Sequence, residues 1–515
     1  MTDELTRRAV KLNPPAGKPK PADRAARVLA DEQSGRPERP GQAEPGESSE
    51  QSDQCAGAEE SAQADEPEHA GPAGSARVAL SAQVTRRGTA VVSDTLAAPS
   101  TTVAAVAPAL ATASAAPAAP AANWSTEVCT DDALWQPGSS VRAEWDELWS
   151  RCPGSTVFQH SAWLHGWWSA YGEPGMLRVV LVRKDGDLVA AAPLRKCRRG
   201  LMTVLTLVGN GISDFGGVLL SDADADATAV PVPTDGPAEA LARLRAALAA
   251  LNRPIDLREL PPGSDARQLA DGWPHRVRTW LDSACLSLPV RPFDEIVRVL
   301  PRRTAERARN KGRRIDRLGV LCLTTPADEA AATVADMLRL HEEQWRGRGI
   351  SPEHLTDRFS QHLSSAVPAL VEAGYADLIR YLCDGELLGC ELMLYSRATA
   401  GSYLAGLSPR LRQQVDLSTL MLRNGMGLAV QRETTEYSML RGLEPYKLRW
   451  GPRMVCNERV LLGARGPVTA VYAQSIAGRK RLVKVAKKVL RRPDHTAQAR
   501  EIQTRLGDKK PGGTE

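Results

Sequence analysis

Residues 441–451, with the sequence RGLEPYKLRWG, combine a glycine, a Glu-Pro step and cations that alternate with large apolar side chains. Gly442 can adopt backbone angles that other residues avoid. Pro445 biases Glu444, the residue before it, toward an extended conformation. The stretch therefore predicts a sharp bend, after which the chain continues as a strand.

The alternation within this expected strand sorts its side chains onto two faces. Successive side chains of a strand point to opposite sides, so Tyr446, Leu448 and Trp450 share one face. Lys447 and Arg449 then share the other face. An aromatic face anchored in the core would hold the cations rigidly, and we expect Tyr446, Arg449 and Trp450 to contact the substrate.

Lys447 and Glu444 are the first candidates for chemistry. We expect Lys447 to stabilise a developing oxyanion or to fix a carboxylate or phosphate of a substrate. Glu444, beside the bend, is expected to act as a base or an orienting group. A second interpretation stays open, in which the cations are solvated and Glu444 is paired to Arg441 or Lys447.

The composition of the 515-residue chain changes abruptly near residue 123. Residues 1–122 are rich in Ala, Pro, Gly, Ser and Glu and hold few aromatic or branched apolar side chains. Such a segment cannot bury enough apolar surface to offset the entropy of ordering, so we expect it to be disordered. We place a first domain at 123–290, a second domain at 291–465, and a basic amphipathic helix and tail at 466–515.

Cysteine usage and hydropathy both favour the cytoplasm. The nine cysteines are scattered, odd in number and without a CxxC pair, which fits reduced thiols better than disulfides or a zinc site. The N-terminus lacks the apolar core of a signal peptide. The sequence also has no run of about 18 apolar residues, which is the length needed to span a bilayer. We therefore expect a cytoplasmic protein.

A helix followed by a hairpin occurs twice in the sequence. Two β-rich runs are joined by Asp185 and Gly186, and two later runs by Asp384 and Gly385, which is a strong hairpin signal. The two glycines lie 199 residues apart (385 minus 186). This repeat predicts a duplicated α/β module, each copy with a mixed sheet flanked by helices, although two chance Asp-Gly turns remain the alternative.

Two helices can be placed around these hairpins. Before the first hairpin, four aromatic side chains at helical spacing indicate a buried amphipathic helix. These side chains are Trp163, Trp167, Trp168 and Tyr171. After the second hairpin, a helix is expected to begin at Asp416 or Ser418, because either residue can serve as its N-cap.

Four stretches occur in an order that resembles a known family. They are FQHSAWLHGWW (158–168), LVGNGISDFGGVLL (207–220), RRTAERARNKGRRIDRLG (302–319) and LRGLEPYKLRWG (440–451). In this order they resemble the GNAT-type acyltransferases of the CelD branch, which is named for cellulose biosynthesis and is related to the FemA, FemB and FemX peptidyltransferases. The resemblance extends from about residue 150 to 465. It implies tandem GNAT-like domains and transfer of an acyl group, usually acetyl from coenzyme A, to an amine.

An acyltransferase of this kind needs an anion site for the diphosphate of its cofactor. A helix N-terminus that follows a strand and a loop supplies such a site, and residues 407–419 occupy that place. Relatives carry spaced glycines there, whereas this chain does not, so its backbone has less freedom to approach a diphosphate. The residues expected to bind the cofactor are Arg410, Arg412, Ser418 and Thr419. A plain capped helix is the alternative.

Four further features are less specific. Asp214 lies among glycines, where a carboxylate can face a cleft as an amine-binding group or base, or can simply be a turn residue. The arginine-rich residues 302–317 can bind an anionic polysaccharide precursor, a phosphate-bearing substrate or RNA, or can form a solvated helix face. The histidines match no zinc motif, so we expect no metal. Residues 478–492 can lie on an anionic membrane surface, contact nucleic acid, or pack on the folded domain.

Three functions are compatible with these features. The first is an N-acyltransferase that uses acetyl-CoA or another acyl-CoA to acylate a small amine, such as an amino sugar or polysaccharide precursor, with peripheral contact to the inner membrane surface. The second is a FemX-like transferase that uses aminoacyl-tRNA, with the arginines of 302–317 holding RNA. The third is a catalytically silent fold that binds an anionic glycan, lipid or nucleic acid.

Overall fold

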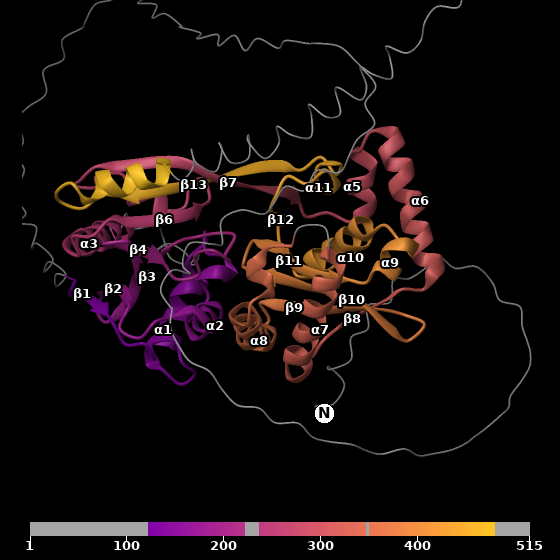
Figure 1. Cartoon of the computed structure of the whole chain (residues 1–515), viewed down its shortest axis with the longest axis horizontal. Helices are drawn as coiled ribbons and strands as arrows, with labels where there is room; N and C mark the ends of the chain where they lie inside the picture. Colours follow the sequence, from indigo (N-terminus) through magenta and orange to yellow (C-terminus); the bar gives the residue numbers. More distant parts are fainter. Residues whose placement is uncertain (1–121, 222–235, 347–349, 479–515) are drawn as a thin grey trace, which may run out of the picture. The chain divides into compact units, whose positions relative to one another are not determined.

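The computed structural model of the protein describes residues 122–221, 236–346 and 350–478. The disorder predicted for residues 1–122 and the basic helix predicted for residues 478–492 fall almost entirely outside these residues. The described chain forms two halves of similar element order (Figure 1).

The described part of the first half contains seven strands, four α-helices and one short 3-10 helix. Its elements are β1 (Trp124–Cys129), α1 (Ser140–Arg151), η1 (Val157–Gln159), α2 (Ser161–Tyr171), β2 (Leu177–Lys184), β3 (Asp187–Arg199), β4 (Met202–Leu207), β5 (Leu219–Leu220), α3 (Gly236–Ala250), β6 (Ile255–Leu260), α4 (Asp265–Gln268) and β7 (Val277–Pro289).

The second half repeats this order with a longer helical connection. Its elements are α5 (Phe293–Val299), α6 (Arg302–Leu318), β8 (Leu321–Thr324), α7 (Ala327–Trp345), η2 (Pro352–Leu355), α8 (Asp357–Glu372), β9 (Ala376–Cys383), β10 (Glu386–Tyr395), β11 (Thr399–Leu407), α9 (Pro409–Gln414), α10 (Leu417–Gln431), β12 (Glu436–Arg441), α11 (Pro445–Leu448) and β13 (Arg453–Leu462).

The strands of the described residues join into one mixed sheet of 13 strands. Its order is β1-β2-β3-β4-β6-β13-β7-β12-β11-β10-β9-β8, with β5 beside β3. From either end inward the two halves follow the same sequence of elements, so β2, β3, β4 and β6 correspond to β9, β10, β11 and β12. The predictions of a mixed α/β fold and of a duplicated module are therefore confirmed.

The last strands of the two halves are exchanged. β7 pairs with β12 of the second half, and β13 pairs with β6 of the first half, while β7 and β13 pair with each other. Figure 1 shows β13 beside β7 and β6. A buried ion pair supports the exchange, because Arg459 of β13 donates two hydrogen bonds of 2.8 and 2.7 Å to Asp256 of β6. Neither sheet half is complete without a strand from the other half of the sequence.

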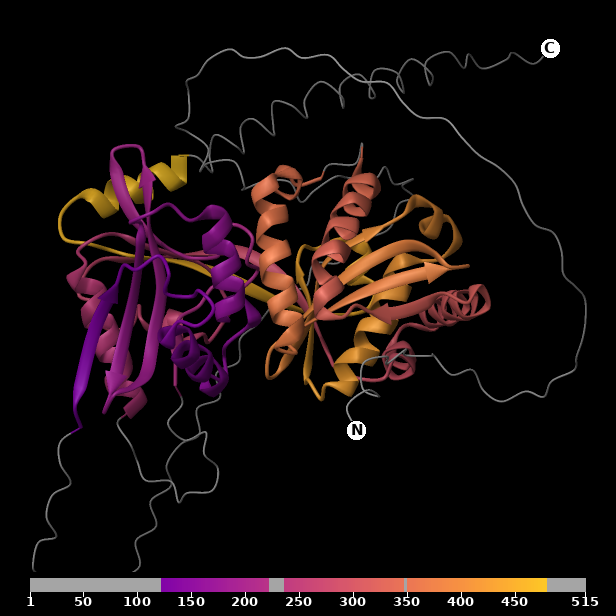
Figure 2. The same ribbon diagram turned by 90° about the horizontal axis from the view of Figure 1, so that it is seen from below.

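The residues after β13 also pack on the first half. Residues 468–478 are helical, and Tyr472, Ala473 and Ile476 form a small core with Val204 of β4 and Leu461 of β13. Figure 2 shows this helix, in yellow, beside the strands of the first half. The Tyr472 hydroxyl donates a hydrogen bond of 2.6 Å to Asp256, so this helix adds to the same buried ion pair.

Both predicted hairpins are confirmed. Asp185 and Gly186 join β2 to β3 with φ values of 54° and 99°, and Asp384 and Gly385 join β9 to β10 with 51° and 80°. Positive φ at both central positions is the turn geometry that matches the twist of the paired strands. The Asp-Gly pairs are therefore required by the backbone at both places.

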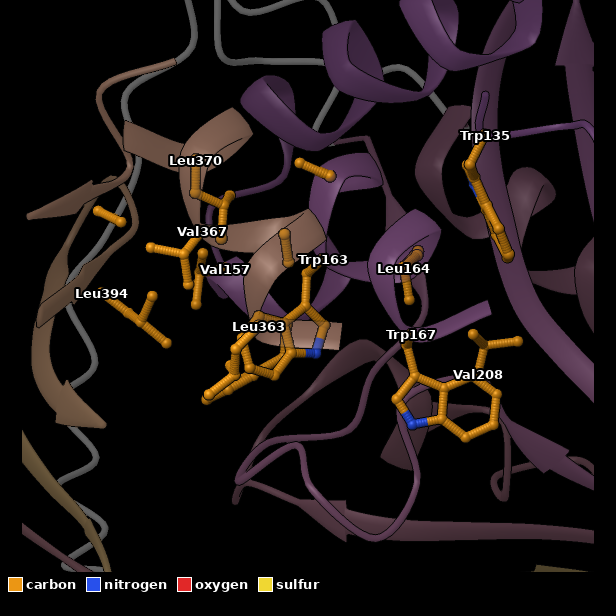
Figure 3. Packing of buried hydrophobic residues seen from close by; sticks show 14 of the residues in the cluster. Trp135, Val157, Trp163, Leu164, Trp167, Val208, Leu363, Val367, Leu370 and Leu394 are labelled. Atoms are coloured by element: carbon orange, nitrogen blue, oxygen red, sulfur yellow. The ribbon is translucent and has the colours of Figure 1, made fainter. Parts of the chain in front are cut away.

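The helix pairs before these hairpins form one shared core. Trp163 and Trp167 of α2 are almost fully buried, which confirms the predicted amphipathic helix. α2 packs against α8, and Figure 3 shows Trp163, Leu164 and Trp167 in one cluster with Leu363, Val367 and Leu370 of α8. At the crossing a Cβ on Gly166 would lie 2.8 Å from Ala366 Cβ, so the close approach depends on glycine.

The bend predicted at Gly442 is confirmed, but the strand predicted after it is wrong. Gly442 has φ 113°, and Glu444 is extended at φ −62° and ψ 140°. The chain then forms the short helix α11 instead of a strand, and β13 begins only at Arg453. Pro445 accounts for the difference, because the fixed φ of proline also suits the first position of a helix, with Glu444 as the N-cap.

As a result, the two predicted faces of residues 446–450 are not formed. Trp450 is buried, whereas Tyr446 and Leu448 are 45% and 48% exposed. Lys447, which was expected to face outward, is only 8% exposed. Helical spacing therefore brings Lys447, rather than the apolar side chains on either side of it, into the interior.

A carboxyl group lies in the core of the second half without a cation among the described residues to pair with it. Glu391 of β10 is 0% exposed, and its two carboxyl oxygens accept hydrogen bonds from the hydroxyls of Tyr381 and Ser402. Burial raises the pKa of Glu391 from 4.5 to about 7, although the two hydroxyl groups partly oppose this shift. The carboxyl therefore keeps its proton in the folded chain over a pH range in which the unfolded chain loses it.

Glu391→Gln should change how stability depends on pH. The wild-type free energy of unfolding should fall as pH rises from about 4.5 to about 7, because only the folded state still holds this proton. At about 1.4 kcal/mol per pKa unit, the variant should gain roughly 3 kcal/mol relative to wild type across this window. Urea unfolding at pH 4.5 and pH 8 measures the difference, and a difference that does not change with pH would contradict the buried acid.

Candidate functional site

The parallel strands β11 and β12 separate shortly after they begin. They pair only where Thr399–Gly401 meets Glu436–Ser438. Beyond these residues the register of β12 against β7 shifts between Ser438 and Arg441, and Leu440 has a left-handed φ of 56°. Such irregularities bend a strand away from its neighbour. The result is a wedge between the ends of the two strands, which we call the β11–β12 wedge.

Where the two strands no longer pair, backbone groups on both edges of the wedge form hydrogen bonds with side chains instead. On β11, Ala405 O accepts from His341 Nδ1 at 2.8 Å, and Leu407 N donates to Gln344 Oε1 at 3.0 Å. Both side chains come from the last turns of α7. A buried backbone group without a partner is costly, so these contacts take the place of a strand.

The β12 edge is bonded in the same way. Leu440 N donates to Ser438 Oγ at 3.1 Å, and Arg441 N donates to Asp214 Oδ2 at 3.4 Å. Asp214 comes from the first half of the chain, so the mouth of the β11–β12 wedge is built from both halves.

The corresponding wedge of the first half is filled by its own chain. β4 and β6 pair only at Leu205–Ile255 and Thr206–Asp256, and Glu259 has a left-handed φ of 56° at the position equivalent to Leu440. Here, however, the loop 208–217 runs along β6. Gly216 N donates to Glu259 O at 2.8 Å, and a Cβ on Gly216 would lie 2.1 Å from Arg258 O. The first wedge is closed by backbone, whereas the hydrogen bonds that the described residues make to the edges of the second wedge come from side chains.

The same loop reaches the second half and builds a polar cluster at the joint. Arg441 donates to both Asp214 and Glu259, at 3.4 Å in the case of Glu259. Asn457 of β13 donates at 3.1 Å to Asp214 O and at 3.1 Å to Glu259 Oε2. We call Asp214, Glu259, Arg441 and Asn457 the joint cluster. A small pocket beside the loop is lined by Phe158, Gln159, Asn210, Ser213, Arg258 and Glu259, among others.

The protonation of the joint cluster follows from its burial. Burial raises the pKa of Glu259, and Arg441 opposes that rise. Burial alone would lower the pKa of Arg441, but Asp214 and Glu259 outweigh it and raise this pKa above its usual range. Arg441 therefore stays cationic and is the partner on which both carboxyl groups depend.

The predicted catalytic residues lie next to this cluster and are already engaged. Lys447 Nζ donates at 2.7 Å to Arg441 O and lies 3.0 Å from Glu444 Oε2. This is the Glu444–Lys447 ion pair that the sequence left open as an alternative. Asp214, the third predicted catalytic residue, holds the side chain and the backbone of Arg441. The structure therefore brings all three predicted residues to the wedge mouth, where each supports the bend.

A second group of predicted residues surrounds Asp416, which is the N-cap of α10 as expected. Its carboxylate accepts from Thr419 N at 2.9 Å, pairs with Lys311 at 2.6 Å, and accepts from Arg449. Ser418 accepts from the indole of Trp450 at 3.0 Å. Burial opposes ionisation of Asp416, but hydrogen bonds from Arg449 and Lys311 outweigh it and hold its pKa well below the usual range.

The remaining predicted residues lie apart from these two groups. Arg410 pairs with Glu386 at 2.7 Å on the surface, and Arg412 is exposed. Tyr446 is exposed on α11. Of the predicted cofactor residues, Ser418 and Thr419 are therefore close to a cationic cluster, whereas Arg410 is held by an acidic partner elsewhere.

Sequence reasoning missed the side chains that form hydrogen bonds to the wedge edges, and it missed two members of the joint cluster. These are His341, Gln344, Ser438, Glu259 and Asn457. A signal existed for Glu259, since the strand IDLREL (255–260) carries charged residues in an apolar run. No pattern marks His341 or Gln344, because their role depends on where α7 ends against β11.

The part of the chain that the structure describes contains no group of three or more His, Cys, Asp or Glu side chains able to hold a metal ion. None of its helices is both long and apolar enough to cross a membrane.

A comparison with family models finds a match in the second half. Residues 302–448 match the model described as the acetyltransferase (GNAT) domain, which covers the chain from α6 to the end of α11. This part contains β11, β12 and the wedge between them. No curated protein matches the sequence.

Several solved structures resemble the fold at low sequence identity. FemX is 13% identical over 62% of this chain and 95% of its own, with a TM-score of 0.44. L-PGS from Bacillus licheniformis is 11% identical over 64% and 94%, with a TM-score of 0.41. A tandem GNAT protein from the clavulanic acid biosynthesis pathway is 13% identical over 67% and 100%, with a TM-score of 0.34.

Arg441→Met should destabilise the protein by about 3 kcal/mol, because it leaves Asp214 and Glu259 buried without their cation. The side chains of these two acids are only 10% and 7% exposed. Arg410→Met is the matched control, since it breaks an exposed pair and should cost less than about 1 kcal/mol. Urea denaturation measures both values, and an equal loss for the two variants would contradict the role of the joint cluster.

Proposed function

With the GNAT acetyltransferase domain at residues 302–448 as the premise, we propose that the protein transfers an acyl group, above all acetyl, from coenzyme A to an amine. The observation that carries this proposal is the contrast between the two wedges. The wedge of the first half is filled by its own loop, whereas among the described residues the edges of the β11–β12 wedge are hydrogen-bonded by side chains. The second half is thus the half that can accept an extended donor.

The chemistry of the donor suits the wedge edges. The pantetheine arm of an acyl-CoA is extended and carries two amides, and each amide offers one donor and one acceptor. Ala405 O and Leu407 N on β11 have the complementary groups, now bonded to His341 and Gln344. The donor can replace Gln344 at Leu407 N. Ala405 O has two lone pairs, so it can accept from an amide of the donor and keep its hydrogen bond from His341. Binding would therefore leave few buried polar groups unsatisfied.

The acceptor would lie at the wedge mouth, where the two halves meet. Lys447 is the cation beside the bend and would stabilise the oxyanion that forms when an amine attacks the thioester. Glu444 orients Lys447, and Asp214 orients Arg441. For the acceptor we propose an amino sugar or another small polysaccharide precursor, as the resemblance to the CelD branch implies, in a cytoplasmic protein that contacts the inner membrane surface.

One feature favours a second donor class. On α6 the arginines 303, 307, 314 and 317 recur at helical spacing and are exposed. The side of the helix opposite them is buried through Ala305, Ala308, Gly312 and Ile315. A face of this kind suits the phosphates of an RNA, so transfer from aminoacyl-tRNA is the alternative to acyl-CoA.

An assay with purified protein separates the candidates. Acetyl-CoA is offered with a panel of amines that includes glucosamine, lysine and aniline, and release of the coenzyme A thiol is followed. Thiol release that depends on the amine supports the proposal. Product formation only with charged tRNA supports the alternative, and no transfer from either donor, with salt-dependent binding of an anionic polymer, supports a silent binding protein.

Asp416→Asn should tighten the binding of coenzyme A by about tenfold, or about 1.4 kcal/mol. Asp416 places a carboxylate at the N-terminus of α10, beside Lys311 and Arg449, where the diphosphate is expected. Asparagine caps a helix as well as aspartate does, so the variant removes the charge and keeps the cap. Asp316→Asn, which removes a nearby carboxylate paired with Arg423, is the control. Calorimetry that finds equal affinity in all three proteins would place the diphosphate elsewhere.

Lys447→Ala should lower turnover by about two orders of magnitude, the usual loss for one oxyanion donor. Arg453→Ala, which removes a cation from an exposed pair with Glu436, should leave turnover unchanged. Steady-state thiol release gives both values, and thermal melts check that the Lys447 variant is folded. A folded Lys447 variant with wild-type turnover would show that this lysine only supports the bend.

A further inference from the structure

Two histidines form a hydrogen-bonded chain that begins at the β11 edge of the β11–β12 wedge. His341 Nδ1 lies 2.8 Å from Ala405 O, and His341 Nε2 lies 3.1 Å from His354 Nδ1. His341 comes from α7 and His354 from η2, and the His354 ring stacks on Phe359 of α8 at 4.6 Å. Both rings are therefore held in place by bonding and packing.

The bonding pattern determines where the protons lie. A carbonyl oxygen only accepts, so His341 Nδ1 must carry a hydrogen and donate it to Ala405 O. In a neutral ring His341 Nε2 then carries a lone pair, and it accepts a hydrogen bond from His354 Nδ1–H. His354 Nε2 consequently carries no hydrogen and has a lone pair as well. It has no hydrogen-bond partner among the described residues.

The environment of His354 keeps this tautomer neutral. Burial lowers the pKa of His354 to about 4, with His341 and Arg441 acting in the same direction and Asp214 and Glu353 opposing them. Burial also lowers the pKa of His341. Asp214 and Arg441, two members of the joint cluster, are thus among the charges that act on His354, and above about pH 5 the ring is neutral.

The other acceptors at the wedge mouth are engaged. Asp214 is bonded to the side chain and backbone of Arg441, Glu444 is paired with the buried Lys447, and Glu259 accepts from Ser283 and Asn457. Among the described residues, each of these carboxyl groups already has a partner, whereas His354 Nε2 has none.

We propose that His354 Nε2 accepts the proton of the acceptor amine during acyl transfer, with His341 as the residue that positions it. This inference rests on the proposed function. The amine nitrogen attacks the thioester carbonyl, a C–N bond forms and the C–S bond breaks. The amine proton passes to His354 Nε2, and from there to the departing thiolate or to water, so the ring returns to its neutral state.

The kinetic test uses acetyl-CoA and the most active amine of the panel above. His354→Gln should lower kcat by about 100-fold, at the low end of the range for loss of a general base, and should leave the Kd of acetyl-CoA unchanged. His341→Leu should lower kcat similarly, because it no longer fixes the tautomer of His354. His341→Gln should restore most of the activity, since its amide can donate to Ala405 O and accept from His354. His165→Gln, in α2 of the first half, is the control with wild-type kcat.

A second measurement does not depend on activity. Nitrogen-15 NMR of the histidine rings in the wild-type protein should show His354 as the Nδ1–H tautomer at pH 7, and this signal should stay neutral as the pH is lowered to about 5. In His341→Leu the tautomer should no longer be fixed.

Two results would overturn the proposal while the proposed function survives: wild-type kcat in a folded His354→Gln variant, or an Nε2–H tautomer of His354 in the wild type at pH 7. A wild-type protein that transfers acetyl to none of the amines would overturn both proposals together.

Discussion

The structure depends on a parallel ladder that stops after three residue pairs. Where β11 and β12 diverge, backbone groups on both edges lose their partners, and each must find a new one. His341 and Gln344 supply them on β11, while Ser438 and Asp214 supply them on β12. Asp214 accepts a hydrogen bond from Arg441, which also donates to Glu259, and His341 is hydrogen-bonded to His354. The polar side chains at the wedge mouth are therefore consequences of one early separation of strands.

The exchange of β7 and β13 explains why this site needs both halves. β13 places Asn457 and Arg459 against residues of the first half, and β7 lies beside β12 of the second half. The two copies then differ in structure. In the first, Gly216 lies so close to Arg258 that the loop closes the wedge, and the same loop extends Asp214 to the other copy. The first copy thus contributes Asp214 to the mouth of the second copy's wedge.

Much of this fold could be predicted from the sequence, because its signals were local. The Asp-Gly pairs at 185 and 384 require positive φ, and the tryptophans of α2 have helical spacing, so the hairpins and the helix followed directly. The strand prediction for residues 446–450 failed because Pro445 suits both an extended segment and the first position of a helix. The alternation of side-chain types alone cannot distinguish these two structures. The joint cluster and the histidine pair could not be predicted, because they join residues far apart in sequence: Asp214 to Arg441, and His341 to Ala405.

The central claim is that the separated edges of β11 and β12 receive the acyl donor. Amide hydrogen exchange of the whole protein, with and without acetyl-CoA, tests it directly. We expect slower exchange on donor binding in peptides that cover residues 399–407 and 436–441, with no change in the equivalent first-half segments 202–207 and 255–260. Protection in the first-half segments, or in neither pair of strands while acetyl-CoA is bound, would show that the donor does not bind between β11 and β12.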